Sequence, residues 1–172
     1  MKRTLLAALL AATLAGCATT PPPAATATAA AAPDNAAALA GMREMKMAFD
    51  ITSADPNHVL LTLIVVEMTH KQLVDAGVTP RIVVGFRGDA SYFTTTDLSK
   101  VKETGHADAL KVMSKIREVR KLPGVEAMEQ CNIPLGARKL AGKDVMPEVQ
   151  LVGNGWISLA SYQTRGYSYI SP

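Results

Sequence analysis

The chain has 172 residues, of which 18 are lysine or arginine and 15 are aspartate or glutamate, so its formal net charge is +3. Hydrophobic residues make up 48% of the chain, which is enough to build a buried core. Removing Lys2 and Arg3 with residues 1–16 leaves a nearly neutral chain. That balance predicts neither nucleic-acid binding nor attraction to an anionic membrane surface.

The amino-terminal segment has the pattern of an export signal. Lys2 and Arg3 precede an uncharged apolar run, residues 5–14, which is far shorter than the ~20 residues of a membrane-spanning helix. The tetrapeptide Leu-Ala-Gly-Cys that ends at Cys17 resembles a bacterial lipobox, in which the cysteine is acylated and becomes the new amino terminus. We therefore predict that residues 1–16 are a lipoprotein signal peptide and that Cys17 is the lipidation site.

The residue after the predicted lipidation site bears on localisation. Ala18 is not the aspartate that retains many lipoproteins in the inner membrane of Gram-negative bacteria, so the resemblance implies an outer-membrane lipoprotein facing the periplasm. An ordinary secretory signal, giving a soluble periplasmic or secreted protein, and a non-cleaved anchor are the alternatives. Residues 18–41 are mostly Ala, Thr and Pro, which is typical of a flexible spacer. Cys17 and this linker would then cover residues 17–43, and residues 44–172 would form one domain.

The predicted domain alternates strands with helices. Expected strands cover residues 45–52, 81–86, 125–130, 148–152 and 167–170; expected helices cover residues 56–76, 107–122 and 133–141, with one more after the glycine turn at 153–155. Residues 89–104 are polar and receive no assignment. In residues 56–76 the β-branched side chains would suit a strand. The length of the segment, its Asp55-Pro56 start and the closing Gly77 favour a buried helix instead.

Strand–helix alternation with short connections predicts an α/β fold, with a mostly parallel sheet of roughly five strands and helices on both faces. In such sheets ligands bind beyond the carboxyl ends of the strands. We expect a set of polar side chains and glycine backbones at this edge of the sheet. They are the thiol of Cys131, the guanidinium of Arg87, the amides of Asn132 and Asn154, the imidazole of His58 in the first turn of the first helix, and the backbones of Gly88 and Gly153.

Cys131 is the sole thiol of the mature chain and the main candidate for chemistry. A free thiol has a pKa of ~8.5, and only its thiolate is a nucleophile. The start of the helix predicted over residues 133–141 and the guanidinium of Arg138 would both favour the thiolate. The competing interpretation is that Cys131 is a small buried hydrophobic residue. One thiol excludes an internal disulfide framework, and the absence of metal-ligand spacing predicts no metal or cofactor.

The other candidates have plainer interpretations beside the functional one. A histidine near a helix start, such as His58, is commonly just solvated. An arginine that ends a strand, such as Arg87, commonly pairs with a carboxylate such as Asp89. Trp156 is expected in the core or at an interface.

A family resemblance extends the interpretation of these residues. Cys131-Asn132 followed by Leu-Gly-Ala-Arg at residues 135–138 resembles the cysteine loop of the DsrE/DsrF-like (YchN-like) family. Residues 149–170 are similar to that family's closing pattern of strand, Gly, short helix, Gln-x-x-Gly-Tyr and strand. The resemblance covers nearly all of residues 45–172. It implies a three-layer α/β/α sandwich assembled into trimers or hexamers, with sulfane sulfur carried as a persulfide on Cys131.

The leading hypothesis is an envelope-anchored sulfur-handling protein that exchanges sulfur with a small compound or a donor or acceptor protein. Asn132 and nearby backbone amides would hold the anionic end of the donor, assisted by Arg87. The membrane would be contacted only through the lipid on Cys17. Two features depart from the family's relay proteins: they act in the cytoplasm, and an oxidising compartment threatens an unshielded thiol. The alternatives are a non-catalytic oligomeric binding or scaffolding module with a structural cysteine, and a redox sensor that forms an intersubunit disulfide.

Overall fold

Five parallel strands, and the helices that connect them, organise the residues that the structure describes, which are 33–102 and 105–172 of a computed structural model. The signal peptide, Cys17 and most of the spacer lie outside these residues. Residues Asn35–Pro172 form one compact unit, which contains the whole sheet. It includes a four-residue helix, α1 (Ala36–Leu39), within the stretch expected to be spacer, and Leu39 packs against the core.

The elements follow the order expected from the sequence. After α1 they are β1 (Glu44–Ile51), α2 (Pro56–Asp75), β2 (Thr79–Phe86), the 3-10 helices η1 (Gly88–Phe93) and η2 (Leu98–Lys100), α3 (His106–Arg120), β3 (Val125–Cys131), α4 (Ile133–Ala137), the 3-10 helix η4 (Gly142–Asp144), β4 (Gln150–Val152), α5 (Gly155–Thr164) and β5 (Ser168–Ile170). The described part of the segment without an assignment contains the two short 3-10 helices η1 and η2. The helix expected over residues 133–141 is shorter, because Lys139 has a φ of 54° and cannot continue a right-handed helix.

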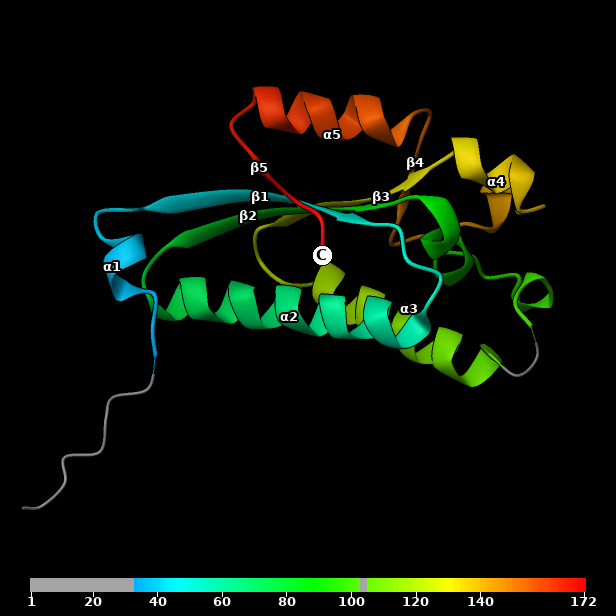
Figure 1. The fold of residues 1–172 in the computed structure, drawn as a ribbon, viewed down its shortest axis with the longest axis horizontal. Helices are drawn as coiled ribbons and strands as arrows, with labels where there is room; N and C mark the ends of the chain where they lie inside the picture. The colour runs from blue at the N-terminus through cyan, green and yellow to red at the C-terminus, as the bar shows by residue number, and fades with distance from the viewer. Residues whose placement is uncertain (1–32, 103–104) are drawn as a thin grey trace, which may run out of the picture. The chain divides into compact units, whose positions relative to one another are not determined.

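The strands are hydrogen-bonded in the order β4-β3-β2-β1-β5, and every pair is parallel. Helices α2 and α3 cover one face of this sheet and α5 covers the other (Figure 1). The predicted α/β fold with a parallel five-stranded sheet between helical layers is therefore confirmed. Among the helices of residues 33–102 and 105–172, none is sufficiently long and apolar to cross a membrane.

The segment over residues 56–75 is a helix, α2, as its start and length predicted, but only the side that faces the sheet is buried. The Asp55 side chain caps it by accepting a hydrogen bond of 2.9 Å from the backbone N–H of Asn57, and Pro56 occupies the first turn. Val59, Leu63 and Val66 recur at three- and four-residue spacing and are fully buried. Burying each such side chain contributes roughly 1.5–3 kcal/mol.

The two faces of the sheet bury very different amounts of apolar surface. Most core residues pack between the sheet and the α2/α3 layer. The α5 side has a small separate cluster of four buried residues, Ala48, Val83, Leu159 and Tyr167. Since side chains alternate along a strand, Asp50 and Glu129 share the face of Ala48 and are buried there beneath a single helix. The chain therefore places polar groups where its core is thinnest.

Candidate functional site

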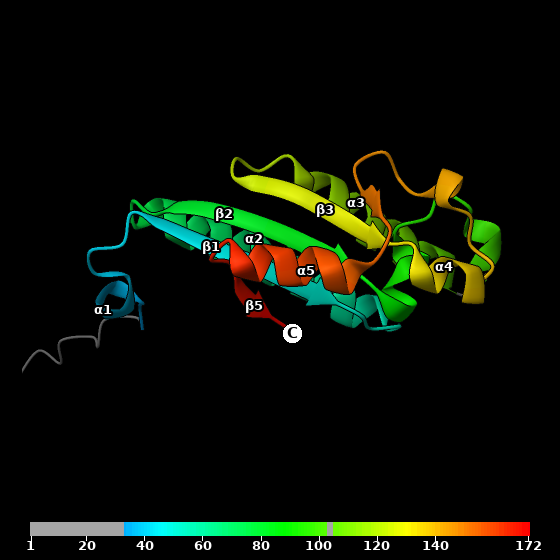
Figure 2. The ribbon, with the colours of Figure 1, turned by 90° about the horizontal axis from the view of Figure 1, so that it is seen from above.

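Cys131 ends β3 at the carboxyl edge of the sheet, and its side chain is 4% exposed. The backbone N–H of Gly155, the first residue of α5, donates a hydrogen bond of 3.2 Å to its Sγ. Figure 2 shows α5 lying over the sheet with its first turn near the end of β3. The sulfur therefore faces both an N–H donor and the positive end of the helix dipole. The sequence predicted this influence from the helix that follows Cys131, but the contact comes from α5.

A glycine is required where α5 approaches the thiol. A Cβ at position 155 would lie 2.8 Å from Cδ of Arg87 and 3.0 Å from Cβ of Cys131. Asn154 caps the helix, because its side chain accepts a hydrogen bond of 2.9 Å from the backbone N–H of Trp156. The Asn-Gly pair therefore both starts α5 and lets its first N–H reach the sulfur.

A pocket of about 310 Å³ opens beside the thiol. It is lined by Arg87, Gly88, Cys131, Ile133, Pro134, Ala137, Arg138, Asn154 and Trp156. The structure thus brings together three of the predicted site residues, Arg87, Gly88 and Cys131, with the edge residue Asn154 and the guanidinium of Arg138. The buried thiol thus borders a cavity that two guanidinium-bearing side chains also line.

Arg87 is anchored by a carboxylate, but not by the predicted one. Its Nε donates to Oδ1 of Asp50 at 2.8 Å, and its Nη2 also contacts that carboxylate. Asp50 is buried at 2% exposure and accepts a further hydrogen bond of 2.5 Å from the Tyr169 hydroxyl. The hydrogen bond with Asp50 raises the pKa of Arg87. The expected pairing with Asp89 is wrong, because adjacent parallel strands place Asp50 beside Arg87.

Arg138 is the second guanidinium at the pocket. Its Nε donates to Oδ1 of Asp89 at 2.7 Å, so that carboxylate pairs with Arg138 and not with Arg87. Its Nη1 also donates to the carbonyl of Pro134 at 3.3 Å. Both guanidiniums at the pocket are thus held by carboxylates, in positions where they can meet an anion bound next to the sulfur.

Two predicted site residues lie away from this pocket. His58 is exposed in the first turn of α2 and does not line the cavity. Asn132 is also exposed and outside the lining; its backbone N–H donates to the carbonyl of Val152 at 2.8 Å. Trp156, expected in the core or at an interface, is 69% exposed, so the core expectation is wrong. Its ring centroid lies 5.7 Å from the Arg87 guanidinium carbon.

A buried carboxylate lies next to the thiol on the same strand. Glu129 accepts a hydrogen bond of 2.9 Å from the Tyr162 hydroxyl and another from the Ser158 hydroxyl, both on α5. Burial, followed by the bond to Glu129, raises the pKa of Tyr162 to about 12. These bonds hold α5 on the sheet and so fix the distance between Gly155 and Cys131.

The chain is similar to one protein family at its amino terminus and to one relative over most of its length. Residues 1–18 match the family described as "Prokaryotic membrane lipoprotein lipid attachment site", which supports the predicted lipid attachment at Cys17. An uncharacterized protein of Aquifex aeolicus (strain VF5) is 25% identical over 126 residues, which is 73% of this chain. The chain spans about half, 55%, of the length of that relative.

Two solved structures are similar to this one. The protein of unknown function MTH1491 from Methanobacterium thermoautotrophicum matches with a TM-score of 0.54 and 24% identity, over 76% of this chain and 99% of that one. The ychN protein from E. coli matches with a TM-score of 0.49 and 11% identity, over 76% of this chain and 100% of that one. The likeness to MTH1491 supports the sandwich fold and nothing finer.

Proposed function

We propose that this protein is an envelope-anchored lipoprotein that carries sulfane sulfur as a persulfide on Cys131, as a member of the DsrE/DsrF-like family. The observation that carries the proposal is the hydrogen bond of 3.2 Å from the Gly155 N–H to Sγ of Cys131, at a sulfur that borders a pocket. The lipid attachment pattern at residues 1–18 supports the anchor, and we place it in the outer membrane facing the periplasm.

The pocket suits a small anionic sulfur donor. Arg87 and Arg138 both line it, and α5 directs its first N–H toward the sulfur. These groups take the anion-holding role that the sequence had given to Asn132, which does not line the cavity. The donor class is therefore polysulfide, thiosulfate or the persulfide of a partner protein.

Sulfur transfer at this site is a balanced substitution. The Cys131 thiolate attacks the outer sulfur of a polysulfide, and a bond forms between Sγ and that sulfur. The donor's S–S bond breaks, and its electron pair leaves with the shortened polysulfide. A second thiolate can then attack the outer sulfur of the Cys131 persulfide and restore the thiolate, so no external oxidant or reductant is required.

Intact mass spectrometry tests the proposal. Residues 18–172, incubated with polysulfide and freed of excess reagent, should gain the mass of one or more sulfur atoms, and dithiothreitol should remove it. Cys131→Ser should gain none, since residues 18–172 contain no other cysteine. An unmodified wild-type protein, or equal addition to the variant, would exclude the persulfide.

The second candidate is a non-catalytic binding or scaffolding module whose cysteine is structural. The low exposure of Cys131, which is 4%, favours this alternative. Under this alternative the thiol would resist iodoacetamide in the folded protein and react only after unfolding. Rapid alkylation in native buffer would favour sulfur handling instead. A redox sensor would form an intersubunit disulfide, visible as a dimer on non-reducing electrophoresis after mild oxidation.

We also propose that the protein is a homo-oligomer, a trimer or hexamer. Leu61, Val65 and Met68 lie at four- and three-residue spacing on α2 and are 60%, 49% and 53% exposed, which makes an apolar stripe on the outer surface of that helix. Light scattering should give the mass of several copies, and Leu61→Glu should lower it. A monomeric wild-type protein would contradict this proposal.

A further inference from the structure

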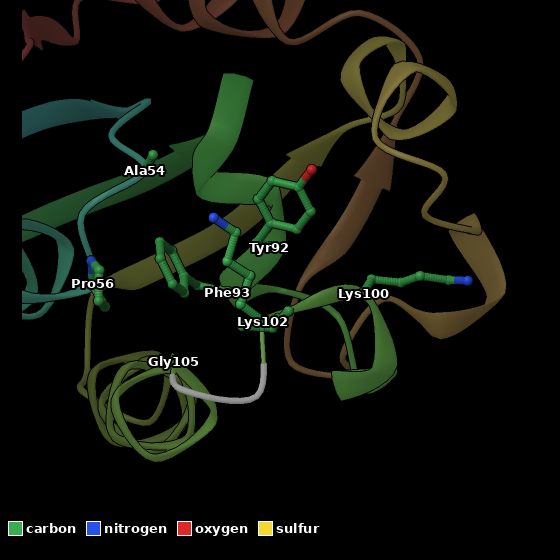
Figure 3. Close-up of a pocket in the computed structure, with 8 residues that line it drawn as sticks. Ala54, Pro56, Tyr92, Phe93, Lys100, Lys102 and Gly105 are labelled. Atoms are coloured by element: carbon green, nitrogen blue, oxygen red, sulfur yellow. The ribbon is translucent and has the colours of Figure 1, made fainter.

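A second pocket lies at the same edge of the sheet, on the other side of η1. Gly88, the first residue of η1, borders the thiol pocket, whereas Tyr92 and Phe93 at its end border the second pocket. This cavity has a volume of about 390 Å³ and is lined by Ala54, Pro56, Tyr92, Phe93, Lys100, Val101, Lys102 and Gly105 (Figure 3). Among the residues that the structure describes, it shares no lining residue with the thiol pocket.

The walls of this pocket are mainly apolar and partly fixed by the core. Phe93 is 4% exposed and belongs to the main core cluster, so its ring cannot swing away without disturbing that core. Tyr92 is half-buried, and its hydroxyl makes no hydrogen bond with another residue of the described ranges. Pro56 and Val101 complete an apolar lining. The volume lies within the ~300–1,000 Å³ range of small-molecule pockets.

One cation is directed into this apolar space. In Figure 3 the Lys102 side chain extends toward the rings of Tyr92 and Phe93, whereas Lys100 extends away from them. Four other lysines, Lys46, Lys71, Lys111 and Lys115, pair with carboxylates. Lys102 has no carboxylate partner among residues 33–102 and 105–172. Within those ranges no carboxylate competes with a ligand for this ammonium group.

We infer that this second pocket binds a one- or two-ring aromatic carboxylate, with its rings against Tyr92 and Phe93 and its carboxylate on the Lys102 ammonium. A wholly apolar ligand would strip water from that ammonium without replacing its hydrogen bonds. An inorganic anion would leave the aromatic walls uncovered. A ligand that is apolar at one end and anionic at the other satisfies both. The inference is independent of the function proposed for Cys131.

A calorimetric titration of the protein comprising residues 18–172 with 2-naphthoate tests this assignment. Because Lys102 is exposed, an ion pair there is worth at most about 1 kcal/mol, so Lys102→Gln should weaken binding by about two- to fivefold. Lys100→Gln is the matched control and should change the affinity by less than about twofold. The uncharged 2-naphthylmethanol should bind more weakly than 2-naphthoate, and its affinity should be the same for wild type and Lys102→Gln.

Amide chemical shifts locate the ligand. The largest changes should fall on Tyr92, Phe93 and Val101, with the Trp156 indole N–H unmoved, and Cys131→Ser should bind 2-naphthoate as tightly as wild type. Absence of binding at millimolar 2-naphthoate, equal affinity of wild type and Lys102→Gln, or shifts centred on Trp156 would each overturn the assignment. None of these results bears on sulfur transfer, which the mass measurement tests separately.

Discussion

One added methyl group, in Gly155→Ala, tests the contact that places α5 on the thiol. The new Cβ would lie 2.8 Å from Cδ of Arg87, 3.1 Å from Cγ of Arg87 and 3.0 Å from Cβ of Cys131. Neither neighbour can move freely. The guanidinium of Arg87 is hydrogen-bonded to Asp50, and the Cβ of Cys131 is attached directly to a central strand. The first turn of α5 must therefore move outward, which lengthens the 3.2 Å bond from N–H to sulfur.

The size of the effect is a balance of two terms. Overpacking of this kind costs about 1–3 kcal/mol. Alanine is intrinsically better than glycine in a helix by about 0.5–1 kcal/mol, and less at a first position. We therefore expect a net loss of about 1–2 kcal/mol in the free energy of unfolding, with slower alkylation of Cys131 because the donor to its thiolate is withdrawn.

Urea unfolding followed by circular dichroism measures the stability, and iodoacetamide with mass detection measures the reactivity of the thiol. Gly153→Ala is the matched control, because a Cβ at position 153 would meet nothing within 4 Å. It should change stability by less than about 0.5 kcal/mol and leave alkylation unaltered. If Gly155→Ala and Gly153→Ala unfold at the same urea concentration and react at the same rate, the described contact does not control the thiol.

Three further predictions concern stability. Asp50→Asn should cost about 3 kcal/mol in urea unfolding, because it removes the charge partner of Arg87 from a carboxylate site that is 1% exposed; a loss below about 1 kcal/mol would contradict this. Leu63→Ala should cost about 2–5 kcal/mol, whereas Leu110→Ala, at 49% exposure on α3, should cost less than about 0.5 kcal/mol, and equal losses would refute the packing described. Because burial raises the pKa of Tyr162 to about 12, the unfolded chain ionises first as the pH rises. The stability that Tyr162 contributes is therefore present below pH ~10 and is lost between pH ~10 and 12. After allowing for solvent screening, this loss in the free energy of unfolding is about 1 kcal/mol. Urea unfolding of Tyr162→Phe should show a smaller loss over the same pH range.

The fold was predictable because its elements are locally marked. Asp55-Pro56 and Gly77 bound α2, and Pro123-Gly124 separates α3 from β3. Parallel strands gather their carboxyl ends at one edge, so Arg87 and Cys131 could be placed together without knowing any long-range contact. The likeness to MTH1491, at a TM-score of 0.54, agrees with that topology.

The details of the site were less accessible because they depend on register and on packing between layers. Asp50 lies beside Arg87 only because β1 and β2 pair in a register that opposes Asp50 to Gly85, and no pattern in the sequence specifies that register. The approach of Gly155 to Cys131 depends on α5 crossing the sheet, 24 residues further along the chain. The second pocket depends on η1 and η2, which arise from a segment without helical or strand periodicity.

The unequal layers of the sandwich explain how one small domain can combine stability with a polar site. The α2/α3 face supplies most of the buried apolar surface, so the sheet does not rely on α5 for its hydrophobic stabilisation. The α5 face can therefore hold Asp50 and Glu129, groups that would be costly within a continuous apolar core. Because hydrogen bonds from Ser158 and Tyr162 to Glu129 position α5, a change in those bonds would alter the placement of Gly155 over the sulfur while leaving the larger core intact.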